Sequence, residues 1–154
     1  MTWGCTLAAT MNADRTAPVF SEGTITVAAA PEHVWDVLAD FEHWPGWNSK
    51  VESVSLDGPV ATGTVFRWKA GSAKLVSTLR DVERPTRLSW TGRTLGIDAI
   101  HAWTFTSANG GTVVSMEESF SGLVAKLLRR KLQRDLDATT VKGLAALKAA
   151  AERR

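Results

Sequence analysis

Two residues with acid–base chemistry, His101 and Glu118, lie in segments that otherwise alternate apolar and polar side chains. His101 has the same parity as Trp103, and Glu118 has the same parity as Met116. Alternate side chains of a strand point to one face, so both polar residues are predicted to lie on an apolar, inward-facing surface. There a carboxylate is expected to fix the tautomer of an imidazole and raise its basicity, which suits proton abstraction next to a carbonyl.

The turn between the two segments predicts that these residues meet. Asn109-Gly110 is a strong signal for a two-residue hairpin, and its register places His101 directly opposite Glu118. A turn centred on Gly110-Gly111 would place them diagonally, but still on the same face. The pair then has two interpretations: a catalytic dyad, or two buried polar groups that satisfy each other or select the polar group of a ligand.

The elements that position this pair begin with residues 25–48. An alternating strand around Ile25 and Val27 leads to Pro31, which suits the first position of a helix because the donor that proline lacks is unused there. The apolar spacing that follows predicts a short helix, and the Trp44–Trp47 run, which contains Pro and Gly, breaks it beside a turn. We expect two short helices in this region.

The rest of the chain is predicted to form strands and one long helix. Six β-rich runs are separated by short turns, at residues 51–56, 64–69, 74–82, 88–92, 98–106 and 112–120. With the strand at 24–28 they make seven, and the short turns indicate an antiparallel order. An apolar stripe from Leu128 to Leu147 predicts a helix from about Leu123 to Ala150 that covers the apolar face of the sheet. The fold class is α+β.

Several of these segments carry family-like motifs. The motifs are Trp-Pro-Gly-Trp at 44–47, Gly-Thr-Val-Phe-Arg-Trp at 63–68, His-Ala-Trp-Thr-Phe at 101–105, Gly-Gly-Thr at 110–112 and Glu-Ser-Phe-Ser-Gly at 118–122. Together they resemble the polyketide cyclase/dehydrase branch of the START-like (SRPBCC) superfamily, over residues 19–150. The resemblance implies a helix-grip fold, in which a curved seven-stranded antiparallel sheet surrounds a long C-terminal helix.

The resemblance implies a fold rather than a reaction, because the superfamily includes lipid carriers, hormone receptors, aromatases and hydrolases. Aromatase and cyclase members often carry pocket tyrosines, and this chain has no tyrosine. We therefore expect binding of a hydrophobic or aromatic, polyketide- or lipid-like small molecule in an internal cavity. The alternative is a cyclase or dehydratase that uses His101 and Glu118 for acid–base chemistry.

The candidate ligand-binding residues are those with inward parity, together with two tryptophans near the end of the helical region. They are Trp44, Trp47, Phe66, Trp68, Ser77, Leu79, Trp90, His101, Trp103, Met116 and Glu118. Trp44 and Trp47 are expected at the mouth of the cavity. The indole side chain offers a large apolar surface and one N–H donor, which suits an aromatic ligand as well as a packed core.

Composition limits the remaining possibilities. A chain of 154 residues fits one domain, placed at 19–154, with residues 1–18 as a mobile N-terminal extension. No apolar run reaches the ~20 residues of a membrane span, and Cys5 is the only cysteine, so we expect no span, no disulfide and a cytoplasmic location. The sequence fits a monomer or a homodimer.

Other site chemistries have little support in the sequence. The three histidines are not spaced as a metal set and no phosphate-loop motif is present, so no metal and no cofactor are expected. The segment from Gly122 onward carries nine Lys or Arg against three acids. A surface-interaction role of this basic helix is a further alternative, but charged helix faces are usually solvated, so no nucleic-acid partner is expected.

Overall fold

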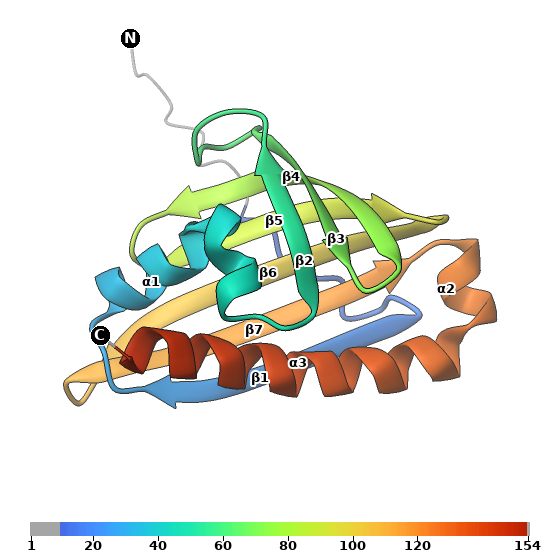
Figure 1. The fold of residues 1–154 in the computed structure, drawn as a ribbon. Coiled ribbons are helices and arrows are strands. Elements are labelled where there is room, and N and C mark those ends of the chain that lie inside the picture. Colours follow the sequence, from blue (N-terminus) through green and yellow to red (C-terminus); the bar gives the residue numbers. More distant parts are fainter. Residues whose placement is uncertain (1–9, 154) are drawn as a thin grey trace, which may run out of the picture.

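A computed structural model describes residues 10–153, so Cys5 and half of the expected extension lie outside the described residues. Its centre is one seven-stranded sheet in the order β1-β7-β6-β5-β4-β3-β2, with every neighbouring pair antiparallel (Figure 1). The strands are β1 (Val19–Val27), β2 (Val51–Leu56), β3 (Val65–Ala70), β4 (Ala73–Glu83), β5 (Arg87–Thr94), β6 (Ile97–Ala108) and β7 (Gly111–Ser121). The predicted seven-stranded antiparallel sheet is confirmed.

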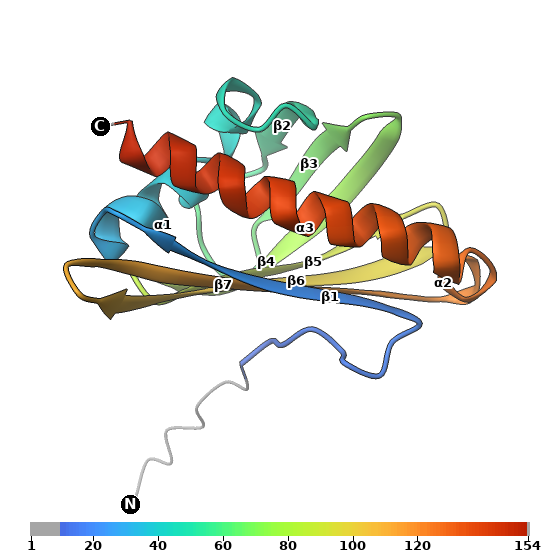
Figure 2. The ribbon, with the colours of Figure 1, turned by 90° about the horizontal axis from the view of Figure 1, so that it is seen from below.

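Two short helices follow β1, as predicted: α1 (Pro31–Ala39) and the 3-10 helix η1 (Phe41–Gly46). The C-terminal region was expected as one helix but forms two, α2 (Leu123–Leu127) and the long α3 (Arg129–Glu152). Leu128 separates them with a backbone outside the helical region, at φ −106° and ψ 25°. Viewed along the sheet, α3 lies across its concave side, and the arrangement is the expected helix grip (Figure 2).

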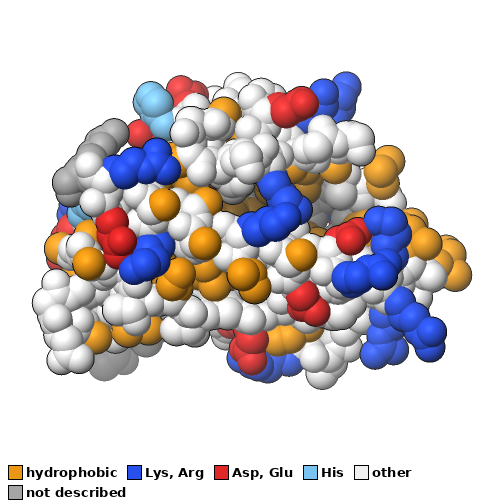
Figure 3. Space-filling view, turned by 60° about the horizontal axis from the view of Figure 1, so that its bottom comes forward, with side chains coloured by type: hydrophobic (Ala, Val, Ile, Leu, Met, Phe, Trp, Pro, Cys, Tyr) orange, Lys and Arg blue, Asp and Glu red, His pale blue; other side chains and the backbone are white. Residues whose placement is uncertain are grey.

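The apolar stripe of α3 packs onto the sheet at its later positions. Leu136, Leu144 and Leu147 are buried, whereas Leu128 at the start of the predicted stripe is exposed because the helix breaks there. The helix comes so close to β1 that a Cβ atom on Gly23 would lie 2.8 Å from Leu144 Cδ1. Lys and Arg side chains gather at the end of the molecule that carries α2 (Figure 3).

The β6–β7 hairpin has the register predicted from its turn. Asn109 and Gly110 both have positive φ, 49° and 80°, as a type I′ turn requires. His101 is paired with Glu118, and Trp103 with Met116. This register fixes which side chains of the two central strands face α3.

The described part of the N-terminal extension, residues 10–18, lies against the outer face of the sheet. The backbone N–H groups of Met11 and Asp14 donate to Asp81 Oδ2 and Ser119 Oγ, at 2.9 and 3.0 Å. Arg87 donates to the Met11 carbonyl and forms a largely buried ion pair with Asp81, at 2.9 Å. These contacts attach Met11 and Asp14 to the outer face of the sheet.

The contact between the β5–β6 turn and the start of α2 gives a test of this packing. Gly122 has φ 104° and ψ 174°, and a Cβ there would lie 2.6 Å from the Gly96 carbonyl oxygen. Gly122→Ala should therefore lower the free energy of unfolding by at least ~1–3 kcal/mol, measured by urea denaturation. Gly143→Ala is the matched control: a Cβ at this position in α3 meets nothing within 4 Å, so this change should stabilise by ~0.5–1 kcal/mol. Equal effects of the two changes would contradict the described geometry.

Candidate functional site

His101 and Glu118 lie side by side on the inner face of the sheet, on neighbouring strands β6 and β7. His101 Nδ1 and Glu118 Oε1 are 3.6 Å apart, which is beyond a hydrogen bond, and the two side chains are 12% and 14% exposed. The imidazole is set between two indoles, with ring centroids 4.7 Å from Trp90 and 5.3 Å from Trp103. The predicted pair is therefore present, in aromatic surroundings and without a direct hydrogen bond.

Burial sets the charge of both groups. Loss of solvation lowers the pKa of His101 to about 3 and raises the pKa of Glu118 to about 8. Near pH 7 the imidazole is neutral and the carboxyl group is protonated. The expected rise in imidazole basicity is wrong, because desolvation opposes charge on both partners and the carboxyl group is itself neutral.

Four buried side-chain polar atoms have no hydrogen-bond partner among the described residues: both ring nitrogens of His101, Trp103 Nε1 and Thr140 Oγ1. More than nine-tenths of buried polar groups in proteins are hydrogen-bonded, so each of these atoms calls for an explanation. Thr140 comes from α3 and is 2% exposed. In the sequence it stands out as the one polar residue at the positions of the apolar stripe, which are Leu128, Leu132, Leu136, Thr140, Leu144 and Leu147.

The other predicted site residues lie mostly in the packed interior. Five aromatic rings of η1 and strands β3 and β5 form one cluster, in which the centroids of neighbouring rings are 4.6–6.4 Å apart: Phe41, Trp44, Phe66, Trp68 and Trp90. Leu79 and Met116 are also buried, and Ser77 Oγ accepts a hydrogen bond from Trp68 Nε1 at 3.0 Å. These residues are brought together as predicted, but they pack against one another.

The two tryptophans expected at a cavity mouth have different positions. Trp44 is only 3% exposed, and its indole N–H donates to the Leu38 carbonyl at 2.8 Å, so it belongs to the core. Trp47 is half-buried and packs against the edge of the same core. Trp44 is therefore not a mouth residue, because the 3-10 helix turns its side chain inward.

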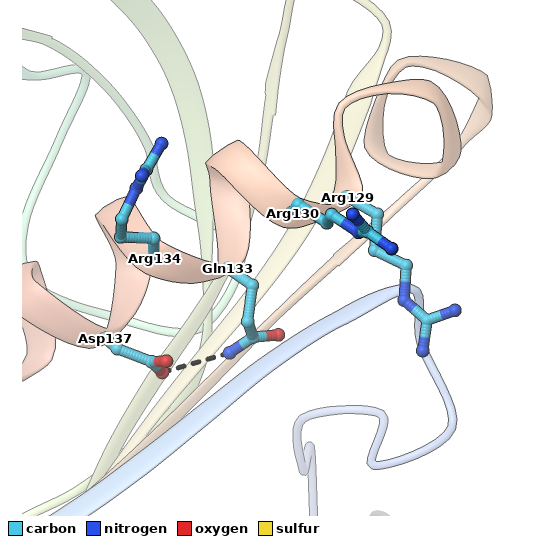
Figure 4. Close-up of a pocket in the computed structure, with 5 residues that line it drawn as sticks. All are labelled: Arg129, Arg130, Gln133, Arg134 and Asp137. Atoms are coloured by element: carbon cyan, nitrogen blue, oxygen red, sulfur yellow. Dashed lines mark hydrogen bonds between the residues drawn. The ribbon is translucent and has the colours of Figure 1, made fainter.

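Two pockets are described, and neither lies between the sheet and α3. One, of about 530 Å³, is on the surface of α3 and is lined by Arg129, Arg130, Gln133, Arg134 and Asp137 (Figure 4). The other, of about 410 Å³, is on the outer face of the sheet beside Arg15. The expected internal cavity is not one of these two, and aromatic side chains occupy much of the space inside the grip.

Residues 10–153 offer no group of three or more His, Cys, Asp or Glu side chains placed to hold a metal ion. Over the same range, no helix combines the length and apolarity needed to cross a membrane. The chemistry available inside the grip is thus that of a neutral imidazole, a protonated carboxyl group, an indole N–H and a hydroxyl group.

The fold and this inward-facing pair define a START-like helix-grip protein. In agreement, the sequence family described as polyketide cyclase/dehydrase and lipid transport matches residues 20–152. The chain belongs to this family. No protein with a curated description matches the sequence significantly.

Solved structures show the same fold at low sequence identity. An aromatase/cyclase from a Streptomyces species is 20% identical, with a TM-score of 0.77 over 88% of this chain and 94% of its own. A START superfamily protein of Mycobacterium smegmatis is 13% identical, with a TM-score of 0.70 over 87% and 97% of the two chains. A hypothetical protein of Helicobacter pylori is 20% identical, with a TM-score of 0.78 over 94% and 99%.

The raised pKa of Glu118 predicts a pH-dependent cost of folding. Its ordinary value is 4.5 and its folded value about 8, so the unfolded chain ionises first and stability is lost as pH rises from about 4.5 towards 8. Glu118→Gln removes this loss and should stabilise by up to about 3 kcal/mol near pH 7, with no gain near pH 4. Urea denaturation across this pH range measures the difference.

Glu117→Gln is the matched control, since Glu117 is the preceding residue of β7 and faces the outer side of the sheet near Arg15. It should show no gain in stability between pH 4 and 8. A Glu118→Gln variant whose stability relative to the unmodified protein is the same at both pH values would show that the Glu118 carboxyl group ionises normally.

Proposed function

We propose that this protein binds a hydrophobic, aromatic small molecule, polyketide- or lipid-like, between the concave face of its sheet and α3. The observation that carries the proposal is the set of four buried, unpartnered polar atoms on His101, Trp103 and Thr140. Stranding such groups costs about 1–3 kcal/mol each, so a ligand that supplies their hydrogen bonds gains a corresponding advantage. The family match supports the same class of ligand.

The charge state of the site selects the kind of polar group on the ligand. With His101 neutral and Glu118 protonated, the pair offers an acceptor and a donor without net charge. A ligand hydroxyl or carbonyl group fits this pair, whereas a carboxylate or an amine would bring an unpaired charge into an apolar space. The proposed ligand is therefore uncharged, with one or two oxygen functions on an aromatic or polycyclic body.

Entry of a ligand requires movement of side chains, because the aromatic cluster is packed. Trp47, which follows η1, and Trp68 of β3 are the half-buried tryptophans of the predicted site. Helix α3 packs mainly along β1, so the central strands face aromatic side chains more than the helix. We infer that the aromatic side chains move apart to admit the ligand.

The lack of a disulfide-forming cysteine pair supports a cytoplasmic setting for this role.

A second candidate function is catalysis of a cyclisation or dehydration, favoured by the pKa of Glu118. An acid whose pKa lies near the working pH is well matched to general acid catalysis, and a value of about 8 meets this condition. Glu118 would protonate the departing hydroxyl group as the C–O bond breaks, and its carboxylate would then take the proton lost from the adjacent carbon as the double bond forms. His101 would orient the substrate oxygen. A pKa of about 3 makes His101 a weak base, so Glu118 is the better candidate for proton transfer.

Ligand binding can be tested by tryptophan fluorescence, since Trp90 and Trp103 flank His101. Titration with 2-naphthol and with naphthalene should quench or shift the emission in both cases. His101→Ala should weaken the binding of 2-naphthol by about 1–3 kcal/mol and leave the binding of naphthalene nearly unaffected, because only 2-naphthol needs a polar partner.

Native mass spectrometry of freshly purified protein is expected to show a retained small molecule.

Thr104→Val is the matched control, because Thr104 is on the same strand as His101 with its side chain on the outer face. It should bind both probes as the unmodified protein does. If neither probe nor other polycyclic compounds change the emission, the ligand-binding proposal fails. The catalytic candidate is tested with any compound that the unmodified protein converts. If Glu118→Gln still binds this compound but no longer converts it, the catalytic candidate is favoured; normal conversion would exclude Glu118 as the acid.

A further inference from the structure

One end of the molecule combines exposed leucines with unpaired cations. Six large apolar side chains of residues 10–153 stand out as exposed, and four of them lie at this end: Leu95 (82%), Leu123 (70%), Leu127 (73%) and Leu128 (48%). Leu95 is at the tip of the β5–β6 hairpin, and the others belong to α2 and the residue after it. We call these four residues the leucine end.

The leucine end is one contiguous surface. A Cβ atom on Gly96, next to Leu95, would lie 3.1 Å from Val124 Cγ2 in α2, and one on Gly122 would lie 2.6 Å from the Gly96 carbonyl oxygen. The hairpin tip and α2 are therefore in contact. Leu95 itself has φ 45°, a conformation that leucine rarely adopts, and its side chain points into solvent. None of the four exposed leucines belongs to the hydrophobic core or packs against it.

Cations outnumber acids around this end. Residues 123–134 contain five Lys or Arg and no Asp or Glu. Among the ion pairs of residues 10–153, only Lys131 of these five has a partner, Asp135. In the pocket on α3, Arg129, Arg130 and Arg134 are exposed, and the nearby Asp137 accepts a hydrogen bond from Gln133 instead (Figure 4). Positive charges in the first turn of a helix oppose its dipole, so this cluster does not serve the stability of α3.

We propose that the leucine end and its surrounding cations dock the protein onto the surface of an anionic phospholipid bilayer. Leucines that enter the acyl boundary with Lys and Arg at the level of the headgroups are the pattern of interfacial membrane binding. The figure of the molecular surface shows this juxtaposition, with hydrophobic and basic side chains side by side at the end that carries α2 (Figure 3). The pocket of about 530 Å³ beside the three arginines offers room for a lipid phosphate.

Other polyanions fit this surface less well. Single-stranded nucleic acids are bound by cations together with aromatic side chains that stack on the bases, and residues 123–134 contain no aromatic residue. Exposed leucines contribute nothing to contacts with a phosphate backbone. The docking surface is also separate from His101 and Glu118, so it does not depend on the identity or the presence of a ligand inside the grip.

The test is flotation of the full chain with phosphatidylcholine vesicles, with and without about one third phosphatidylglycerol. The unmodified protein is expected to float only with the anionic vesicles, and less so as salt rises. Arg129→Gln with Arg130→Gln should lower the partition coefficient about 25-fold, at about fivefold per cation. Leu123→Ser with Leu127→Ser should lower it at least tenfold, because two exposed leucines lose their apolar burial.

Val141→Ser with Lys142→Gln is the matched control, since Val141 is 69% exposed on α3 outside the leucine end and Lys142 is an exposed cation beside it. This control should stay within about twofold of the unmodified protein. The proposal is overturned if anionic vesicles are not bound, or if the control loses as much binding as the leucine variant. It is also overturned if the leucine variant binds normally while a single-stranded nucleic acid competes fully with the vesicles.

Discussion

The antiparallel pairing of β6 with β7 determines the position of every group in the candidate site. Side chains on a strand alternate with a period of two, so a slip of one residue would turn His101 and Trp103 to the outer face together. The positive φ angles of Asn109 and Gly110 prevent such a slip, because they define the two-residue turn. The neutral pair, the aromatic walls and the orphaned indole N–H all depend on this register.

Desolvation is the second effect that shapes the site. A histidine and a glutamate close together usually form a charged pair, but here burial moves both pKa values towards the neutral forms. The 3.6 Å separation leaves the imidazole nitrogens unbonded. The interior is therefore polar without being charged, which is a compact way to combine selectivity for oxygen functions with an apolar environment.

Much of this organisation could be predicted from the sequence, because it follows from local rules. Strand parity placed His101 beside Glu118, and the Asn-Gly turn gave the register of the hairpin. Three features could not be predicted. The charge states depend on the extent of burial, the break at Leu128 depends on how α2 meets the β5–β6 turn, and the inward turn of Trp44 depends on the 3-10 geometry of η1. Each results from contacts between segments distant in sequence or from fine backbone geometry.

Met11 and Asn12 complete a largely buried polar network on the outer face of the sheet. The family match begins at residue 20, yet Asp81 receives hydrogen bonds from Met11, Ser89 and Arg87. Burial opposes the ionisation of Asp81, and these bonds outweigh that effect and lower its pKa. A chain cut at the family boundary would lose the hydrogen bonds of Met11 to Asp81 and Arg87. The segment matched by the family therefore leaves out one part of this buried network.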